Sequence, residues 1–457
     1  MKTDVKANIS VLEERKASIS QCQGDGKGIC CEKESVSGAV SQRACVYCGA
    51  RVVLNPITDA YHIVHGPIGC ASYTWDIRGS LSSGSELFRT SFSTDLRETD
   101  IIFGGEKKLN AAIDELMEKA EPKPQVIFVY ATCIVGVIGD DVEAVCRNAE
   151  KKFGIRVIPV RAPGFSGTKS LGYKMACNAI MQLIRPHYDD TAEKKFAINI
   201  LGDFNLAGEM WIIKSYFRKI GIPVLSGMTG DSSYESLKNA PNARLNIVQC
   251  AGSSMYLANR MEAEMNIPNI KVSFFGIQDT VNSLIRTAEA LGNAEIIEKA
   301  KSFAYENAAH VQKIINKYKP QLSGKKAAIF VGGGFKAISL IRQFNELGIE
   351  TVVVGTQTGK KDEYEIIAEI VRPGTVILDD ANPAELEQFM LEKGADILVG
   401  GVKERPLAYK LGIAFCDHNH ERKHALAGFE GIKNFTEELN LSLNSPVWQY
   451  LDKAEGE

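Results

Sequence analysis

Short apolar runs alternate with helical patterns along most of this chain, and this alternation constrains its fold more than any other feature. Runs typical of buried strands are found at 126–130, 157–160, 196–201, 245–249 and 326–331. Helical stretches are found at 171–184, 209–220, 255–265 and 337–347. The succession of strand, loop, helix and strand is typical of a parallel sheet covered by helices. We therefore expect an α/β protein with three doubly wound domains and mainly parallel sheets.

Breaks in this alternation suggest where the domains end. The first forty-odd residues mix glycine and serine with charges and show no sustained apolar period, and a polar stretch at 185–190 separates two sets of strands and helices. Domains of roughly 100 to 200 residues would fit three times into the chain. We predict an N-terminal arm at 1–44 and α/β domains at 45–190, 191–322 and 323–457, the last with a C-terminal segment.

Composition excludes several classes of partner. The net charge of -3 gives no basic footprint for nucleic acid and no polybasic patch for a membrane. The N-terminus has no apolar signal core, and no run of about 18 apolar residues occurs. We expect a cytoplasmic protein. Its eleven cysteines then favour reduced thiols, some of them metal-bound, over a disulfide framework.

The segment 65–70, with the sequence HGPIGC, places Cys70 after a run of turn-forming residues. Small residues leave room for a bulky group beside the sulfur, so Cys70 is a candidate metal ligand, although a buried free cysteine is the simpler alternative. Cys45 and Cys133 have similar settings beside turns or strand ends. Three thiolates do not complete a four-iron cluster, so either Cys48 or another subunit would supply the fourth ligand.

Other features carry weaker signals. Cys22, Cys30 and Cys31 could bind a metal, but the simpler interpretation is that they are free surface thiols of the arm. The triple glycine at 332–334 follows a strand and precedes a helix, yet it matches neither the dinucleotide fingerprint nor a P-loop. A helix start there would favour an anion, and Lys336 adds positive charge.

Several motifs together resemble the nitrogenase component 1 family, and the similarity runs in one order over about residues 45–440. The motifs are CVYCGA at 45–50, HGPIGC at 65–70, DIIFGGEKKL at 100–109, IGDD at 138–141, SLG at 170–172, NIVQC at 246–250 and FFG at 274–276. The resemblance implies an alpha-type chain of three parallel-sheet domains. It also implies that Cys45, Cys70 and Cys133 bind a [4Fe-4S] cluster shared with a beta-like partner chain in an alpha2-beta2 complex.

The same resemblance implies that Cys250 corresponds to the cysteine that holds the iron-molybdenum cofactor. The family's second anchor, a histidine, precedes a segment found here at 428–431, but that position is occupied by Ala427. Lys169 and Tyr173 replace a glutamine and a histidine that catalytic chains use at the cofactor. A phenol, with a pKa of about 10, is a poorer proton donor at neutral pH than an imidazole, with a pKa of about 6.5. These departures predict a site that binds a cluster and then releases it.

The resemblance therefore favours a cofactor-assembly scaffold without turnover of its own. It would bind an iron-sulfur precursor, or the finished iron-molybdenum cofactor with homocitrate, through Cys250, with Lys169, Arg78, Lys336 and Tyr173 around it. Its other partners would be a precursor donor, the nitrogenase iron protein and a recipient nitrogenase component 1. A catalytic alpha subunit, a vanadium-system counterpart and a cluster-free structural protein are the alternatives.

One polar cluster of side chains is a further candidate metal site. His418, His420 and His424 lie near Glu421, and such residues are common transition-metal ligands. A loop that shields or releases the cofactor is the simpler interpretation of this cluster.

Overall fold

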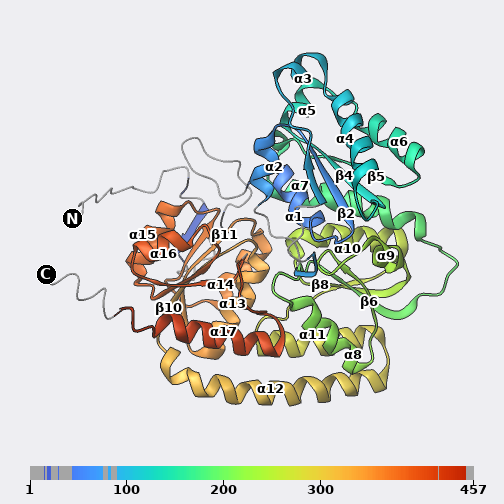
Figure 1. The fold of residues 1–457 in the computed structure, drawn as a ribbon. Helices are drawn as coiled ribbons and strands as arrows, with labels where there is room; N and C mark the ends of the chain where they lie inside the picture. The colour runs from blue at the N-terminus through green and yellow to red at the C-terminus, as the bar shows by residue number, and fades with distance from the viewer. Residues whose placement is uncertain are drawn as a thin grey trace, which may run out of the picture.

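Three sheets flanked by helices make up the described part of the chain in this computed structural model (Figure 1). The structure describes residues 15, 18–21, 29, 44–75, 81–83, 90–419 and 421–448. The expected α/β fold with mainly parallel sheets is confirmed. All strands except β1 lie within the three ranges predicted for the domains, whose limits stay a prediction.

The first sheet is parallel, with the strand order β3-β2-β4-β5. Its strands are β2 (Ala60–His65), β3 (Ser91–Ser93), β4 (Val126–Ala131) and β5 (Arg156–Arg161). Its helices are α1 (Val46–Leu54), α2 (Ile68–Trp75), α3 (Glu98–Phe103), α4 (Glu106–Lys119), α5 (Cys133–Ile138), α6 (Val142–Phe153) and α7 (Lys169–Ile184), with short 3-10 turns η3 (Gly164–Ser166) and η4 (Arg185–His187).

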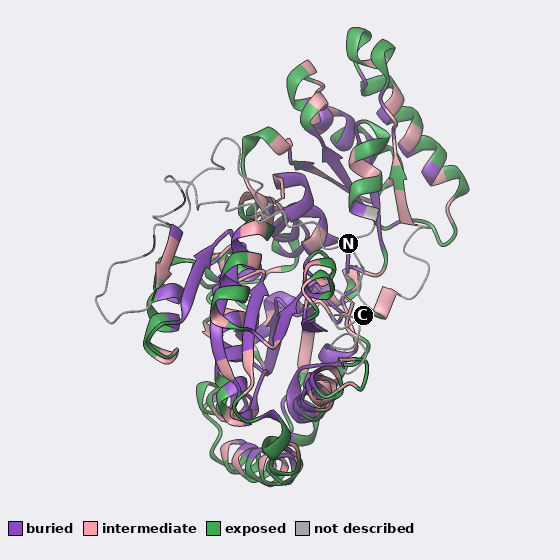
Figure 2. Cartoon of the chain, turned by 90° about the vertical axis from the view of Figure 1, so that its left-hand side faces the viewer, coloured by how far each residue is buried: buried purple, intermediate pink, exposed green. Residues whose placement is uncertain are grey.

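Strand β4 shows why this sheet has helices on both faces. Phe128 and Tyr130 belong to the apolar core beneath α1 and α7, whereas Ile127 and Val129 belong to the core beneath α4 and α6. Alternate residues of a strand point to opposite faces, so an uninterrupted apolar run is buried on both. Strands β2 and β4 are accordingly buried throughout, and the outer helix faces are exposed in Figure 2.

The second sheet is also parallel, with the strand order β7-β6-β8-β9. Its strands are β6 (Lys195–Leu201), β7 (Val224–Met228), β8 (Ala243–Val248) and β9 (Asn269–Lys271). Its helices are α8 (Glu209–Ile220), α9 (Tyr234–Asn239), α10 (Ala251–Met265), α11 (Ile277–Leu291) and α12 (Ala294–Leu322), with a 3-10 turn η5 (Ala240–Asn242). The long helix α12 runs along the base of Figure 1 beneath this sheet and the third.

The third sheet has six strands in the order β1-β12-β11-β10-β13-β14. Its strands are β1 (Ile19–Gln21), β10 (Lys326–Val331), β11 (Glu350–Thr356), β12 (Val376–Asp379), β13 (Ile397–Gly400) and β14 (Ala414–Asp417). Its helices are α13 (Gly334–Leu347), α14 (Lys361–Ile370), α15 (Pro383–Lys393), α16 (Arg405–Lys410) and α17 (Gly428–Leu443). Strand β1 is antiparallel to β12, so part of the segment expected to be an arm joins this sheet at its edge.

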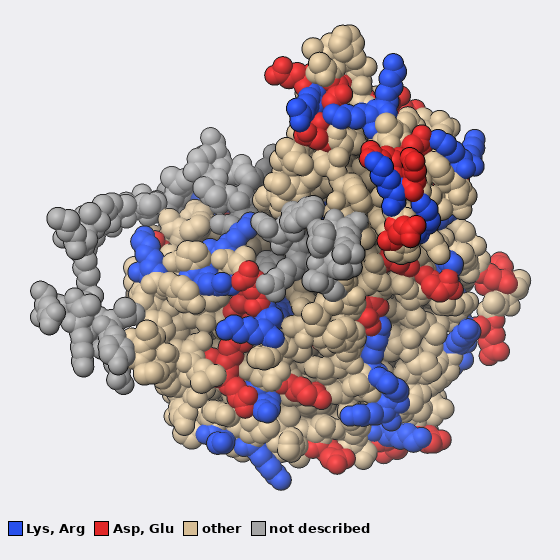
Figure 3. Space-filling view, viewed as in Figure 1, with Lys and Arg blue, Asp and Glu red and all other residues tan. Residues whose placement is uncertain are grey.

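Charged side chains of both signs are interspersed among the described residues on the face drawn in Figure 3. None of the helices in the described ranges is long and apolar enough to cross a membrane.

Candidate functional site

Three cysteines lie near one end of the first sheet. Cys133 begins helix α5 just after strand β4, and Cys70 lies in helix α2 just after strand β2. Since β2 and β4 are paired and parallel, their carboxyl ends meet at one edge of the sheet. Cys45 is the N-cap residue of α1 and forms an isolated antiparallel bridge with Thr168 at the start of α7. Cys45, Cys70 and Cys133 are called the cysteine triad below.

Gly164 brings two of these sulfurs close to one backbone position. Its N–H donates a hydrogen bond of 3.0 Å to Cys133 Sγ. A Cβ atom placed on Gly164 would lie 3.0 Å from Cys133 Sγ and 3.4 Å from Cys45 Sγ. The missing side chain therefore lets the backbone approach both thiols and leaves room beside them.

Cys70 lies close enough to Cys133 and Cys45 for their charges to affect its pKa. Burial raises the pKa of the Cys70 thiol, and Cys133 and Cys45 raise it further because like charges oppose a second thiolate. Bound iron would reverse this effect, since metal ligation requires thiolates. Among the described residues, no three His, Cys, Asp or Glu side chains converge on a position for a single metal ion. In an iron-sulfur cluster each cysteine would bind a different iron, so its ligands need not converge on one position.

Exposed apolar side chains lie close to the triad cysteines in the sequence. Four of them lie within four positions of a triad cysteine or of Gly164 in the sequence, namely Ile68, Tyr73, Val137 and Phe165, which are 57%, 51%, 70% and 65% exposed. Large apolar groups that gather at one place on a surface are typical of a protein contact. We call these four residues the apolar rim.

A pocket surrounds Cys250, between α7, the second sheet and the third. Cys250 follows strand β8 directly and is the N-cap residue of α10. Side chains from all three parts of the chain line the pocket, among them Lys169, Tyr173, Asp203, Lys336 and Arg422. Gly202 has a φ of +82°, and a Cβ atom there would lie 2.8 Å from Cys250 Cβ. A glycine at this position therefore lets the end of β6 pack against the cysteine.

Cationic side chains converge on the Cys250 pocket. The pKa of Lys169 is raised, chiefly through its electrostatic interaction with Tyr173. Lys336 donates hydrogen bonds to the backbone carbonyl of His418 and, at 3.3 Å, to Asn419 Oδ1. Burial and then the positive charge of Arg422 hold the pKa of Lys336 well below its ordinary value. An anionic ligand would relieve this repulsion.

Cys48 is linked electrostatically to Cys45 of the triad and to Lys169 of the Cys250 pocket. It stands on α1 one turn after Cys45 and is buried. Burial raises the pKa of the Cys48 thiol, and the ammonium group of Lys169 opposes this shift. Tyr173 in turn has both Cys48 and Cys250 within electrostatic reach.

Two carboxyl groups that the sequence analysis did not single out share the pocket wall. Arg422 Nη1 donates a hydrogen bond of 2.6 Å to Glu209 Oε1, and Arg422 lowers the pKa of Glu209 although burial opposes this. Burial and the charge of Glu209 raise the pKa of Asp203 to about 7. Asp203 stands two residues after β6, so its place at the carboxyl end of a strand was a usable signal.

Residues 45–444 match the model of one protein family, described as nitrogenase component 1 type oxidoreductase. The chain belongs to the nitrogenase component 1 family. The family membership predicted from the sequence motifs is thereby confirmed, and it ties the chain to nitrogen fixation and metal-cluster chemistry.

Two relatives match this member of the nitrogenase component 1 family over almost their whole length, and both are named nitrogenase iron-molybdenum cofactor biosynthesis protein NifE. The protein of Clostridium pasteurianum is 66% identical over 452 residues, which cover 98% of each chain. The protein of Methanosarcina barkeri is 52% identical over 452 residues, covering 96% of this chain and 97% of its own. A solved structure titled "Nitrogenase Cp1 at pH 5" superposes with a TM-score of 0.86 at 31% identity, covering 96% of this chain and 97% of that one.

Ala427 occupies the position at which the resemblance places the family's second cofactor anchor. It is fully buried as the N-cap residue of α17, and it is not one of the residues that line the Cys250 pocket. The next residue, Gly428, has a φ of +75°, and a Cβ atom there would lie 2.6 Å from the Tyr216 hydroxyl. A histidine at position 427 would need space that core side chains now fill.

The histidines near residue 420 are separated rather than gathered where the structure describes them. His418 is buried, with its ring edge-on to Phe275 at 5.0 Å and to Phe435 at 5.3 Å between centroids. Glu421 pairs with Arg405, and His424 is exposed. His420, Arg78, Cys22, Cys30 and Cys31 lie outside the described residues.

The start of α13 is already capped by a carboxylate from the chain itself. Glu363 Oε1 accepts the N–H of Phe335 at 3.2 Å, and a Cβ atom on Gly334 would lie 2.7 Å from Glu363 Cβ. The triple glycine therefore accommodates Glu363, and the nucleotide interpretation gains no support from this geometry.

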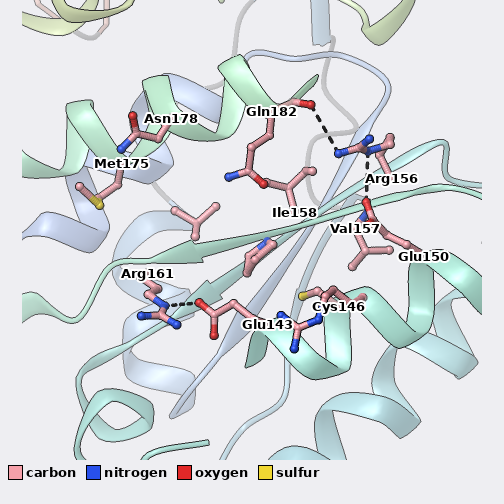
Figure 4. Close-up of a pocket in the computed structure, with 13 residues that line it drawn as sticks. Glu143, Cys146, Glu150, Arg156, Val157, Ile158, Arg161, Met175, Asn178 and Gln182 are labelled. Atoms are coloured by element: carbon pink, nitrogen blue, oxygen red, sulfur yellow. Dashed lines mark hydrogen bonds and ion pairs between the residues drawn. The ribbon is translucent and has the colours of Figure 1, made fainter. Parts of the chain in front are cut away.

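A second pocket lies at the outer edge of strand β5, between α6 and α7 (Figure 4). Two ion pairs in this pocket, Arg161 with Glu143 and Arg156 with Glu150, join β5 to α6. Glu150 Oε1 also accepts the N–H of Val157 at 3.1 Å, and Pro159 has no N–H to offer. Both features block the addition of another strand at this edge, so the pocket is not a strand-docking site.

Proposed function

We propose that this chain is a scaffold on which the nitrogenase iron-molybdenum cofactor is matured from an iron-sulfur precursor before transfer to the catalytic component. The observation that carries the proposal is the Cys250 pocket, which combines one thiol with cationic side chains while Ala427 is buried away from it. The names of relatives that are 66% and 52% identical over nearly the whole chain support it.

Each pocket residue has a defined part in this proposal. Cys250 would bind an iron of the precursor, and Lys169 and Lys336, with Arg78, would neutralise the anionic cargo and its homocitrate. Burial raises the pKa of the Tyr173 phenol, so this group keeps its proton at neutral pH. A pocket with one covalent ligand and a weak proton donor suits temporary storage better than turnover.

The cysteine triad would hold a [4Fe-4S] cluster shared with a NifN-type beta-like chain in an alpha2-beta2 complex. When bound, this cluster supplies a one-electron redox centre that also joins the two subunits. The partner chain would provide the remaining ligand and cover the apolar rim. Cys48 is the alternative fourth ligand, because it lies one helical turn from Cys45.

Maturation requires further partners that deliver and receive the cargo. A NifB-type donor would supply the precursor, the nitrogenase iron protein would serve the maturation step, and a nitrogenase component 1 would receive the product. Reversible, largely electrostatic binding at the Cys250 pocket would allow each hand-over.

The test loads the purified complex with precursor and follows activation of a cofactor-deficient nitrogenase over time. Cys250→Ser should load several-fold less precursor and leave the spectrum of the shared cluster unchanged. Cys177→Ser changes a buried cysteine outside the pocket and serves as the matched control. Equal loading and transfer by Cys250→Ser and the parent would contradict the proposal.

The runner-up function is that of a catalytic alpha subunit, and the similarity to the solved nitrogenase structure favours it over other enzymes. It predicts substrate reduction by the isolated complex with iron protein and reductant, without any recipient. Ammonia formation at a rate comparable with nitrogenase would support it, and metal analysis would separate molybdenum from vanadium systems.

A further inference from the structure

His65 connects the ends of three neighbouring strands behind the cysteine triad. It is the last residue of β2 and is fully buried. Its Nδ1 lies 3.0 Å from the hydroxyl of Thr94, the residue that follows β3. Its backbone carbonyl accepts two hydrogen bonds from Thr132, the residue that follows β4, from the N–H at 3.2 Å and from the hydroxyl at 2.9 Å.

Asp140 extends this network to the start of helix α4. Its Oδ2 lies 3.0 Å from His65 Nε2, and its two carboxylate oxygens accept the N–H of Gly105 at 3.0 and 3.1 Å. A Cβ atom on Gly105 would lie 2.6 Å from Asp140 Oδ2 and 2.9 Å from His65 Cε1. Only a glycine therefore leaves room for the paired imidazole and carboxylate.

The network reaches the triad through Thr132 and Gly66. Thr132 immediately precedes Cys133, and its hydroxyl also interacts with the thiol of Cys70. A Cβ atom on Gly66 would lie 2.0 Å from that hydroxyl, so the segment leading to Cys70 packs directly on Thr132. A shift of His65 would thus move the backbones that carry two triad cysteines.

We infer that His65 and Asp140 are positioning residues for the cysteine triad, holding Cys70 and Cys133 at a fixed separation through Thr132. This inference rests on the proposed function, in which the triad binds a cluster. The side chain of His65 contacts Thr94 and Asp140, so both His65 and Asp140 act on the triad through the strand ends that they join. Ligands held in place before binding lose less entropy when the cluster binds.

The test uses the co-purified complex with the partner chain. Asp140→Asn and His65→Leu should lose iron to a chelator several-fold faster than the parent and alter the electron paramagnetic resonance line shape of the shared cluster. His65→Gln, whose amide can still donate to Asp140, should be affected less than His65→Leu. The double variant His65→Leu/Asp140→Asn should be little worse than either single variant, because both changes break one network.

His62 provides a matched control on the same strand. It is also fully buried, and its Nδ1 lies 2.9 Å from the Tyr130 hydroxyl, outside the network of His65. His62→Leu should lower the thermal stability of the domain without changing the cluster spectrum. Precursor loading at Cys250 should stay at the parent level in all of these variants.

Two outcomes would overturn the inference: parental iron retention and line shape in both Asp140→Asn and His65→Leu, or identical spectral changes in His62→Leu. Should His65→Leu fail to fold, Thr94→Val removes the hydroxyl that contacts His65 Nδ1 and accepts the N–H of Gly66, and it should still accelerate iron loss. Cys70→Ala separates this inference from the proposed function. An unchanged cluster in Cys70→Ala would refute the cluster assignment itself. Loss of the cluster in Cys70→Ala, with an unchanged cluster in the His65 and Asp140 variants, would refute only the positioning role.

Discussion

Arg422 and Glu209 form a buried ion pair in the wall of the Cys250 pocket, joined by a hydrogen bond of 2.6 Å. The pair connects the segment before α17 with the first residue of α8, and the two side chains are 8% and 1% exposed. A charge buried this deeply is tolerated because its partner offsets the cost of desolvation.

Removing one member of this pair should therefore destabilise the chain strongly. We expect Glu209→Gln to lower the free energy of unfolding by about 3–5 kcal/mol, and Arg422→Met/Glu209→Gln to cost less, because no charge is then left unpaired. Urea unfolding measures both values. Glu115→Gln breaks an exposed pair with Lys119 and should leave the free energy of unfolding nearly unchanged. An equally small effect of Glu209→Gln would contradict the prediction.

Gly164→Ala should impair the cysteine triad. The added methyl group would lie 3.0 Å from Cys133 Sγ, so the sulfur or the turn must move. We expect a several-fold loss of bound iron from the purified complex, measured by metal analysis. Gly69→Ala, beside Cys70, meets no atom within 4 Å and should retain parental iron. Similar iron contents in the two variants would show that the close approach at Gly164 is unimportant.

Lys169→Met should weaken binding of the anionic precursor several-fold, because it removes a positive charge from the pocket that contains Cys250. The difference from the parent should shrink at high ionic strength, where salt screens the interaction. The iron that remains on the complex after gel filtration measures precursor binding. Lys174→Met changes an exposed lysine on the same helix and should bind like the parent. A loss that is the same for both lysines would indicate a nonspecific charge effect.

Glu404 predicts a pH dependence of stability. Burial raises the pKa of Glu404 to about 7, while its Oε2 accepts the N–H of Gly401 at 2.8 Å. The folded state then binds this proton more tightly than the unfolded state, so the contribution of Glu404 to stability falls as the pH rises from about 4.5 to about 7.

Glu404→Gln stays neutral and should lack this fall. We expect it to be more stable than the parent by about 3 kcal/mol at pH 8 and equal to it below about pH 4. Thermal unfolding between pH 4 and pH 8 measures the difference. A difference that does not vary with pH would exclude Glu404 as the titrating group.

The sequence by itself determined the central strands of the three sheets, such as β4, β6, β8 and β10, and the residues at their ends. The run at 126–130 became β4 and the helical pattern at 209–220 became α8, because apolar periodicity and helix signals act over a few neighbouring residues. Cys133 and Cys250 were placed after strands for the same reason, and the family motifs extended that placement to a shared chemistry.

Only the tertiary structure decided which of these residues meet. It brought Gly164 against Cys133 and Cys45, and it paired Arg422 with Glu209, although no local pattern at position 422 distinguishes it from a surface arginine. It also placed Ala427 in the core and joined β1 to the third sheet. Such contacts link segments far apart in the chain, and they depend on how whole sheets and helices pack, which residue type and local spacing do not specify.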